Sequence, residues 1–341
     1  MKTREEMKMF SNKELRSMII TLFFEQLLVM LVGIVDTFVV SSCGEAAVSG
    51  VSLVNQFNTI FIYLFTALAS GGAIIVSQYI GNKDEKRTVL SSSQLLMFSI
   101  VFSIILSILV LIFNKQLLGL LFGKVESDVM KACVTYLRIS AYSYPALAIY
   151  NAGAALYRSM AKTKVTMYIS FAANIINVVG NIIGVYVLKA GVAGVAYPSL
   201  ISRVFSAIII TVLCFNKKLK AYYDSKDIFR FDGKMLKRIL NIAIPNGVEN
   251  GIFQLVKVAL SSIVAMFGTY QIAANGVAQS IWSLAALVGS AMGPVFITVI
   301  GQCMGANCKA CDLKLTVEEM KYLEERYKPH PLVGVMKENN Q

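Results

Sequence analysis

The stretch LFFEQLLVMLVGIVDTFVVSSCGEAAVSGVSLVNQ, residues 22–56, decides how the chain folds. It forms an apolar helix and turn, and the helical part carries two carboxylates, Glu25 and Asp36. These lie 36 − 25 = 11 residues apart, which at about 100° per residue is three turns plus about 20°, so they share one helix face. A charged side chain at membrane depth costs about 2.5 to 3.5 kcal/mol on insertion scales, so protein or a water-filled cavity usually shelters it. One face of this helix is therefore expected to look inward.

This stretch is repeated later in the chain. A constant shift of 249 − 25 = 224 residues sets Glu249 on Glu25 without a gap. The same shift aligns further identical pairs, several of them polar or glycine: Val32 with Val256, Gly44 with Gly268, Gln78 with Gln302, and Gly81 with Gly305. We interpret this as an internal repeat.

Composition indicates the class of protein. Hydrophobic residues make up 56% and charged residues 15% of the 341 residues, whereas soluble domains average about 25% charged. We therefore predict an all-α, multi-pass protein of the cell membrane. No small-residue cleavage site follows the first apolar run, so no removable signal peptide is expected. The net charge of +12 is interpreted as a topology signal, and no nucleic-acid partner is predicted.

Apolar segments long enough to cross about 30 Å of hydrocarbon occur eight times. They cover residues 17–41, 53–80, 90–113, 134–156, 165–188, 192–215, 239–267 and 272–300.

The loops between these segments predict their orientation. Alternate connections hold 19 Lys and Arg on one side and 4 on the other. By the positive-inside rule, the N-terminus, the loop 216–238 and the C-terminal tail are cytoplasmic. The second copy of the repeat begins six helices after the first, an even number, so both copies run in the same direction.

We divide the chain into four parts. Residues 1–215 form an N-lobe of six helices, and residues 216–238 form a cytoplasmic linker between lobes. Residues 239–305 form a partial C-lobe of two helices, and residues 306–341 form a polar cytoplasmic tail with a short helix near 316–327. Nothing after Ile300 is expected to span a bilayer.

Signatures of catalysis and of metal binding are weak or absent. The chain has no phosphate-binding GxxxxGK[ST], no nucleophile elbow and no HExxH motif, so we predict a protein that is not an enzyme. One CxxC, Cys308 to Cys311, with the single His330 lacks a second ligand pair, and no metal site or cofactor is predicted. Without a nucleotide site, transport would depend on an ion gradient.

Asp36 is the strongest candidate for coupling. A carboxyl group in a poorly solvated pocket can take up a proton and release it when a cation approaches, so one group can exchange the two. Asp36 could alternatively serve only to hold a neighbouring helix. Glu25 and Glu249 are further binding candidates, with a purely structural role equally open. Lys257 is a possible partner for an acid.

The fifth apolar segment adds a polar stripe. Asn174, Asn177 and Asn181 follow i, i+3 and i+7 spacing and share a helix face. Such amides commonly join helices, at about 1 kcal/mol each. They become binding candidates if Asp36 faces them.

The motifs resemble those of the multidrug and toxic compound extrusion (MATE) transporters. The resemblance rests on the VDT motif in residues 25–56, on GGAIIVSQYIGNKD at 71–84, on NIINVVGNIIGVYVLKAGVAGVAYPSLISR at 174–203, and on IPNGVENG at 244–251 with GQCMGAN at 301–307. It covers roughly residues 14–307.

This resemblance implies two six-helix lobes around a central cavity and antiport of organic cations against protons or sodium. It assigns cation coupling to Asp36, places Asn177 and Asn181 beside it, and carries a second acid only loosely to Glu249. The sequence departs from the family in three ways: Asn181 stands where some proton-coupled relatives have an acid, Thr21 stands where relatives often have proline, and the last four helices are missing.

Three functions remain open at this stage. The first is an antiporter for organic cations or drugs, compromised by truncation. The second is a lipid-linked oligosaccharide flippase of the same superfamily, whose cavity should be cationic. The third is a non-transporting remnant that pairs with another chain to complete the C-lobe.

Overall fold

The computed structural model describes residues 10–122, 127–265 and 269–311. These residues are almost entirely helical, and no strand occurs among them. The helices are α1 (Asn12–Ser41), α2 (Glu45–Gly81), α3 (Glu85–Phe122), α4 (Ser127–Tyr142), α5 (Tyr144–Ser159), α6 (Thr163–Ile182), α7 (Ala193–Cys214), α8 (Ser225–Phe229), α9 (Gly233–Ala265) and α10 (Thr269–Cys311), with a π-helical turn η1 (Ile183–Val187) after α6.

Every predicted span falls on helix, but six helices of the described part are by themselves long and apolar enough to cross a membrane. They are α1, α2, α3, α6 continued through η1, α7 and α10. The span predicted at 134–156 is divided between α4 and α5, and the one predicted at 239–267 lies in α9, which carries charged residues. The protein is thus a multi-pass, all-helical membrane protein.

The break between α4 and α5 has a local cause. Pro145 occupies the first turn of α5, where its missing N–H is tolerated. Because proline has no N–H to donate, it cannot continue a helix from α4. Ser143 lies at the junction, and its backbone N–H donates to the carbonyl of Ser140 at 2.9 Å. The two helices therefore meet in a tight turn inside the lobe.

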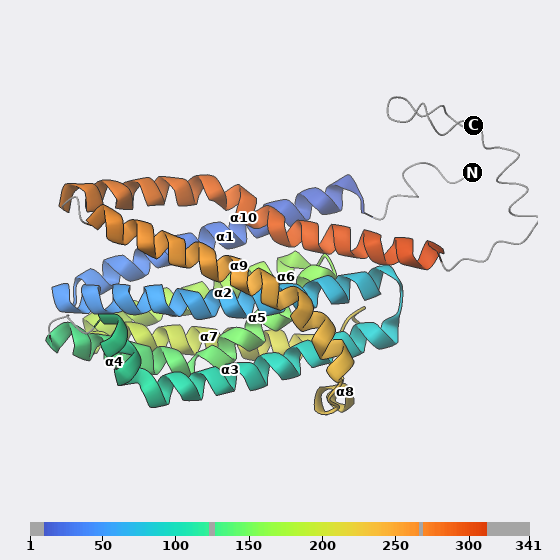
Figure 1. Cartoon of the computed structure of the whole chain (residues 1–341), viewed down its shortest axis with the longest axis horizontal. Helices are drawn as coiled ribbons and strands as arrows, with labels where there is room; N and C mark the ends of the chain where they lie inside the picture. The colour runs from blue at the N-terminus through green and yellow to red at the C-terminus, as the bar shows by residue number, and fades with distance from the viewer. Residues whose placement is uncertain (1–9, 123–126, 266–268, 312–341) are drawn as a thin grey trace, which may run out of the picture.

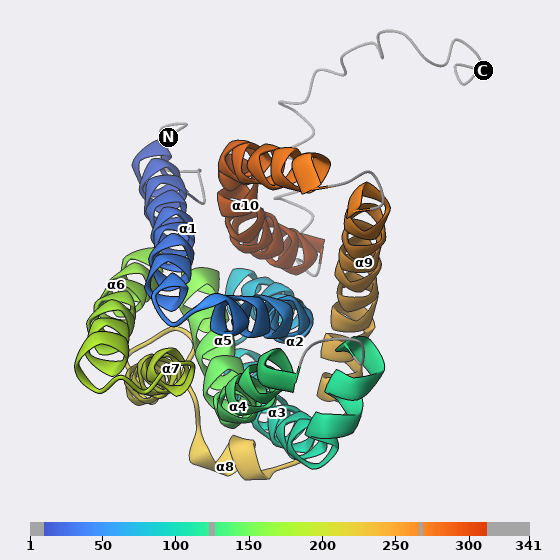
Figure 2. The same cartoon turned by 90° about the vertical axis from the view of Figure 1, so that its left-hand side faces the viewer.

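The long helices lie side by side along one axis (Figure 1). In the end-on view, α5 lies among α2, α3, α6 and α7, while α9 and α10 pack against α2 (Figure 2). Helix α10 also packs against α1. Helix α2 therefore lies between α5 and the two later helices.

Close backbone contact joins α2 to α10. A Cβ on Gly81 would collide with the backbone carbonyl of Gln302. A Cβ on Gly305 would likewise collide with the backbone carbonyl of Gln78. These contacts are reciprocal, because the shift of 224 residues turns Gly81 into Gly305 and Gln78 into Gln302. A Cβ built on Gly301 would lie 2.7 Å from Cβ of its own repeat partner, Ser77. The repeated segments thus cross each other symmetrically.

The linker differs from the expected loop. Helix α8 lies within it, and α9 begins at Gly233, inside the predicted 216–238 linker. Helix α10 continues to Cys311, beyond the predicted end of the C-lobe at residue 305. The predicted tail helix at 316–327 lies outside the described residues. The domain boundaries themselves stay a prediction.

Candidate functional site

Asp36 lies near the end of α1 and turns toward α6. The Asn181 amide donates to Asp36 Oδ1 at 2.5 Å and to Asn177 Oδ1 at 3.1 Å. The Asn177 amide donates in turn to Ser199 Oγ on α7 at 3.0 Å. A continuous polar chain therefore joins α1, α6 and α7 through the interior of the bundle.

The sequence of α6 explains how the two amides reach this place. Asn177 and Asn181 are spaced i, i+4 on its buried face and are 6% and 0% exposed. Asn174 shares the predicted stripe but does not join the chain, because its amide nitrogen is buried without a hydrogen-bond partner. The stripe prediction holds for the two residues that the resemblance also selects.

Arg203 adds a positive charge beside this chain. It lies one turn after Ser199 on α7, and its guanidinium donates to Ser143 Oγ at 2.6 Å, at the break between α4 and α5. Arg203 also interacts electrostatically with Asp36 and with Tyr136 on α4. The site therefore holds one carboxylate and one guanidinium among neutral polar groups.

One acceptor in this site is left over. Asn181 Oδ1 is buried without a hydrogen-bond partner, although its own amide nitrogen donates twice. A buried unpaired oxygen next to a carboxylate costs about 1 to 3 kcal/mol. Such an oxygen suits a cation or a proton donor, which would remove that cost. Chemically, the arrangement around Asp36 offers a carboxylate and an unpaired amide oxygen as acceptors.

Glu25 lies on the same face of α1 and also meets α6, as predicted for two acids on one face. It is 4% exposed, and Arg158 at the end of α5 donates to its Oε1 at 2.6 Å. Thr166 Oγ1 on α6 donates to Oε2 at 3.0 Å. Both carboxylate oxygens of Glu25 are thus hydrogen-bonded, and they connect α1 to α5 and α6. No sequence signal pointed to Arg158, because 133 residues separate the two charges.

A family model described as MatE matches residues 21–183, the region that holds Glu25, Asp36, Arg158 and both amides. Over this region the chain is similar to the MATE transporters.

Curated proteins agree with this assignment. The uncharacterized transporter YisQ of Bacillus subtilis is 25% identical over 84% of this chain and 63% of its own length. The probable multidrug resistance protein NorM of Thermotoga maritima is 23% identical over 87% of this chain and 64% of its own length. The chain thus spans a little under two thirds of these MATE relatives.

Solved structures show the same fold. A multidrug resistance MATE family transporter of the MOP superfamily, in an outward-facing conformation, has a TM-score of 0.79 at 21% identity, covering 86% of this chain and 65% of that one. A MOP superfamily transporter from Pyrococcus furiosus, described as having a binding pocket of reverse polarity, also has a TM-score of 0.79, at 20% identity over 88% and 67%. The described helices therefore adopt the MATE fold.

The remaining charged candidates of this MATE relative lie apart from Asp36. Glu249 is exposed on α9 and makes no described ion pair. Lys257, expected to pair with an acid, lies instead over the rings of Phe253 at 5.0 Å and Trp282 at 4.4 Å. The geometry brings Asp36, Asn177 and Asn181 together and leaves Glu25 and Glu249 outside that group.

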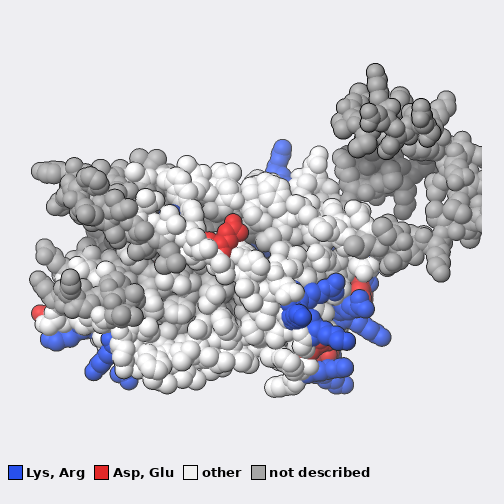
Figure 3. Space-filling view, viewed as in Figure 1, with Lys and Arg blue, Asp and Glu red and all other residues white. Residues whose placement is uncertain are grey.

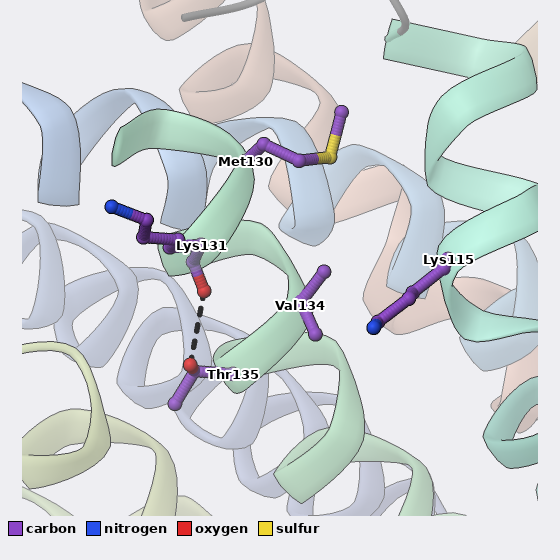
Figure 4. A pocket seen from close by; sticks show the side chains of 5 residues that line it. All are labelled: Lys115, Met130, Lys131, Val134 and Thr135. Carbon is purple, nitrogen blue, oxygen red and sulfur yellow. Dashed lines mark hydrogen bonds between the residues drawn. The ribbon is translucent and has the colours of Figure 1, made fainter. Parts of the chain in front are cut away.

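A pocket lies between α3 and α4 (Figure 4). Helix α4 is at the end of the bundle opposite α8 (Figure 1). The lining of the pocket includes Lys115, Met130, Lys131, Val134 and Thr135. Lys131 forms an exposed ion pair with Asp128 at 3.0 Å. The pocket contains none of the candidate residues. Cys308 and Cys311 lie in the last turn of α10, and His330 lies outside the described residues.

Proposed function

We propose that this protein exports organic cations or drugs across the cell membrane in exchange for protons or sodium ions, and that Asp36 is the coupling residue. The observation that carries the proposal is the contact between Asp36 and Asn181 beside an unpaired buried oxygen. A carboxylate sheltered from water at membrane depth is a typical part of an ion or substrate pathway. Two cations that both bind to it would compete for the same group.

Arg203 gives the exchange a physical basis. Its guanidinium partly balances the carboxylate of Asp36. A cation that enters must compete with this tethered charge, so it is bound weakly enough to leave again. The names of several relatives, such as the multidrug export protein MepA of Staphylococcus saprophyticus, support the choice of drugs as substrates.

We infer the orientation from the distribution of basic residues. The ends of α2, α5 and α7 and the beginnings of α1 and α9 lie at one end of the bundle (Figure 1). Lys and Arg gather at this end (Figure 3). By the positive-inside rule we assign this end to the cytoplasm. Asp36 then lies in the outer half of the membrane.

Efflux of ethidium from cells that lack their own pumps tests the proposal. Cells with the protein should lose dye faster than cells without it, and Asp36→Asn should remove the difference while the protein remains in the membrane. Asp128→Asn serves as the matched control, because this acid is exposed and distant from α6. Undiminished efflux in the Asp36→Asn variant would overturn the coupling role.

A further inference from the structure

The linker between α7 and α9 carries two solvent-exposed aromatic side chains. Phe229 is 90% exposed and Phe231 is 70% exposed, on either side of the exposed Arg230. Large apolar side chains in this arrangement are costly in water and indicate contact with another phase or molecule. Ile228, directly before them, packs inward against the cluster around Tyr223. The outward direction of the phenylalanines is thus a property of the local fold.

Two adjacent residues of α3 fix the linker in this position. Gln94, which is fully buried, donates to the carbonyls of Asp227 and Arg230 and accepts from the backbone N–H of Asp232 at 3.1 Å. Ser93 Oγ accepts from the backbone N–H of Asp224 at 3.1 Å. These bonds hold the backbone before and after the two phenylalanines. The backbone that carries the two rings is therefore fixed against α3.

Charge on this segment is strongly positive on its exposed side. Residues 216–238 hold eight Lys and Arg against three Asp, a balance of 8 − 3 = +5. Two of the acids serve the backbone, because Asp224 caps α8 and Asp232 caps the start of α9. Lys226 and Arg230 are exposed and take part in no described ion pair. Their charge is thus free to attract an anionic surface.

The segment lies where a membrane surface would be. Helix α8 is at the periphery of the bundle and at one end of its long axis (Figures 1 and 2). Lys and Arg gather around this end, next to the largely uncharged flank of the molecule (Figure 3). Aromatic rings at the boundary and basic residues facing anionic lipid are the usual features of interfacial segments.

We propose that the clamped segment 226–231 is a lipid anchor, in which Phe229 and Phe231 enter the headgroup layer and Lys226 and Arg230 bind anionic lipid headgroups. The assignment of this layer to the cytoplasmic leaflet rests on the orientation proposed above. Anionic lipids gather in that leaflet and attract basic residues near the surface. The anchor would hold the linker between the two repeats at a fixed depth.

Tryptophan fluorescence in vesicles tests the anchor. Trp282 is the single tryptophan, so Phe229→Trp in a Trp282→Phe background reports from the linker alone. The full protein is placed in vesicles of phosphatidylcholine mixed with phosphatidylglycerol, with one of the two lipids brominated at a time. We expect shallow bromines to quench the introduced indole and aqueous iodide to leave it bright. Emission typical of water, with strong quenching by iodide, would overturn the proposal.

Lipid selectivity is the second readout. Brominated phosphatidylglycerol should be enriched around the introduced indole by about fivefold for each basic residue near the surface. Replacing both Lys226 and Arg230 by Gln should remove the enrichment. Replacing both Lys217 and Lys218 by Gln removes the same charge from the linker outside the clamped segment and should leave the enrichment in place.

Equal loss in the two double variants would overturn the assignment to Lys226 and Arg230, because it would show a general effect of net charge. The readouts require no transport. A failed anchor would therefore leave the antiport proposal standing, and failed antiport would leave the anchor standing.

Discussion

Asn181 on α6 donates a hydrogen bond to the carboxylate of Asp36 on α1 at 2.5 Å, across 145 residues of sequence. The same amide donates to Asn177, which continues to Ser199 on α7. A change of charge on Asp36 therefore reaches two further helices through one amide. This contact connects the proposed ion chemistry to the packing of the lobe.

Removing the amide should weaken cation binding. Asn181→Ala deletes the donor to Asp36, and hydrogen bonds to charged groups are worth about 1.5 to 3 kcal/mol. We expect the ethidium concentration that gives half-maximal efflux to rise about tenfold or more. Asn177→Ala should have a smaller effect, because Asn177 does not touch Asp36. Equal effects of both substitutions would contradict a direct role of Asn181.

The ion pair of Glu25 with Arg158 should determine stability and leave coupling untouched. Glu25→Gln leaves the Arg158 guanidinium with no compensating charge, and breaking a buried pair costs about 3 to 5 kcal/mol. Arg158 retains 22% exposure of its side chain, so we expect the lower end of that range. Thermal unfolding of the purified protein should show the loss.

The double variant Glu25→Gln with Arg158→Met gives the matched comparison. It removes both charges, and it should recover part of the stability lost in the single variant. If the double variant is less stable by the sum of the two single changes, the pair does not interact as described.

The reciprocal glycines should control the crossing of α2 and α10. A methyl group at Gly81 or Gly305 would collide with a backbone carbonyl of the opposite helix, so either Gly→Ala change should push the helices apart. Thermal unfolding of the purified protein measures the loss of this packing. We expect both variants to unfold at a clearly lower temperature than the unaltered protein.

Gly289→Ala is the control for the crossing. It lies on α10 as well, but a Cβ there meets nothing within 4 Å. An unchanged unfolding temperature in Gly305→Ala, or an equal fall in Gly289→Ala, would show that the close contact is unnecessary.

Gln94 should protect the linker from proteolysis. Gln94→Ala removes three hydrogen bonds to the linker backbone, each worth about 1 kcal/mol. Trypsin should then cut after Lys226 and Arg230 at least about ten times faster. Gln116→Ala makes the same change at an exposed position of α3 and should leave the rate unchanged. Equal rates in both variants would mean that Gln94 does not hold the linker.

Periodic features of the helices could be predicted from the sequence. The shared face of Glu25 and Asp36 and the pairing of Asn177 with Asn181 both follow from helical spacing, and both acids of α1 indeed contact α6. The family and the multi-pass fold followed from motifs and composition. Such features depend on residues close together in the chain.

Long-range partners could not be predicted. Arg158 looks like a loop residue because it precedes Lys162 and Lys164, yet it ends α5 and turns inward to Glu25. Gln94 carries no sequence signal, because its importance comes from a linker more than 130 residues away. The apolar run at 134–156 predicts one helix, because hydrophobicity continues across Pro145, where the structure has a break between two helices.

The exchange of cations at Asp36 is the central claim, and ion release on substrate binding tests it most directly. Tetraphenylphosphonium is added to the purified protein in weak buffer, while pH and bound radioactive sodium are followed together. The account predicts release of a proton or a sodium ion from the unaltered protein and none from Asp36→Asn. Equal release from both proteins would contradict it.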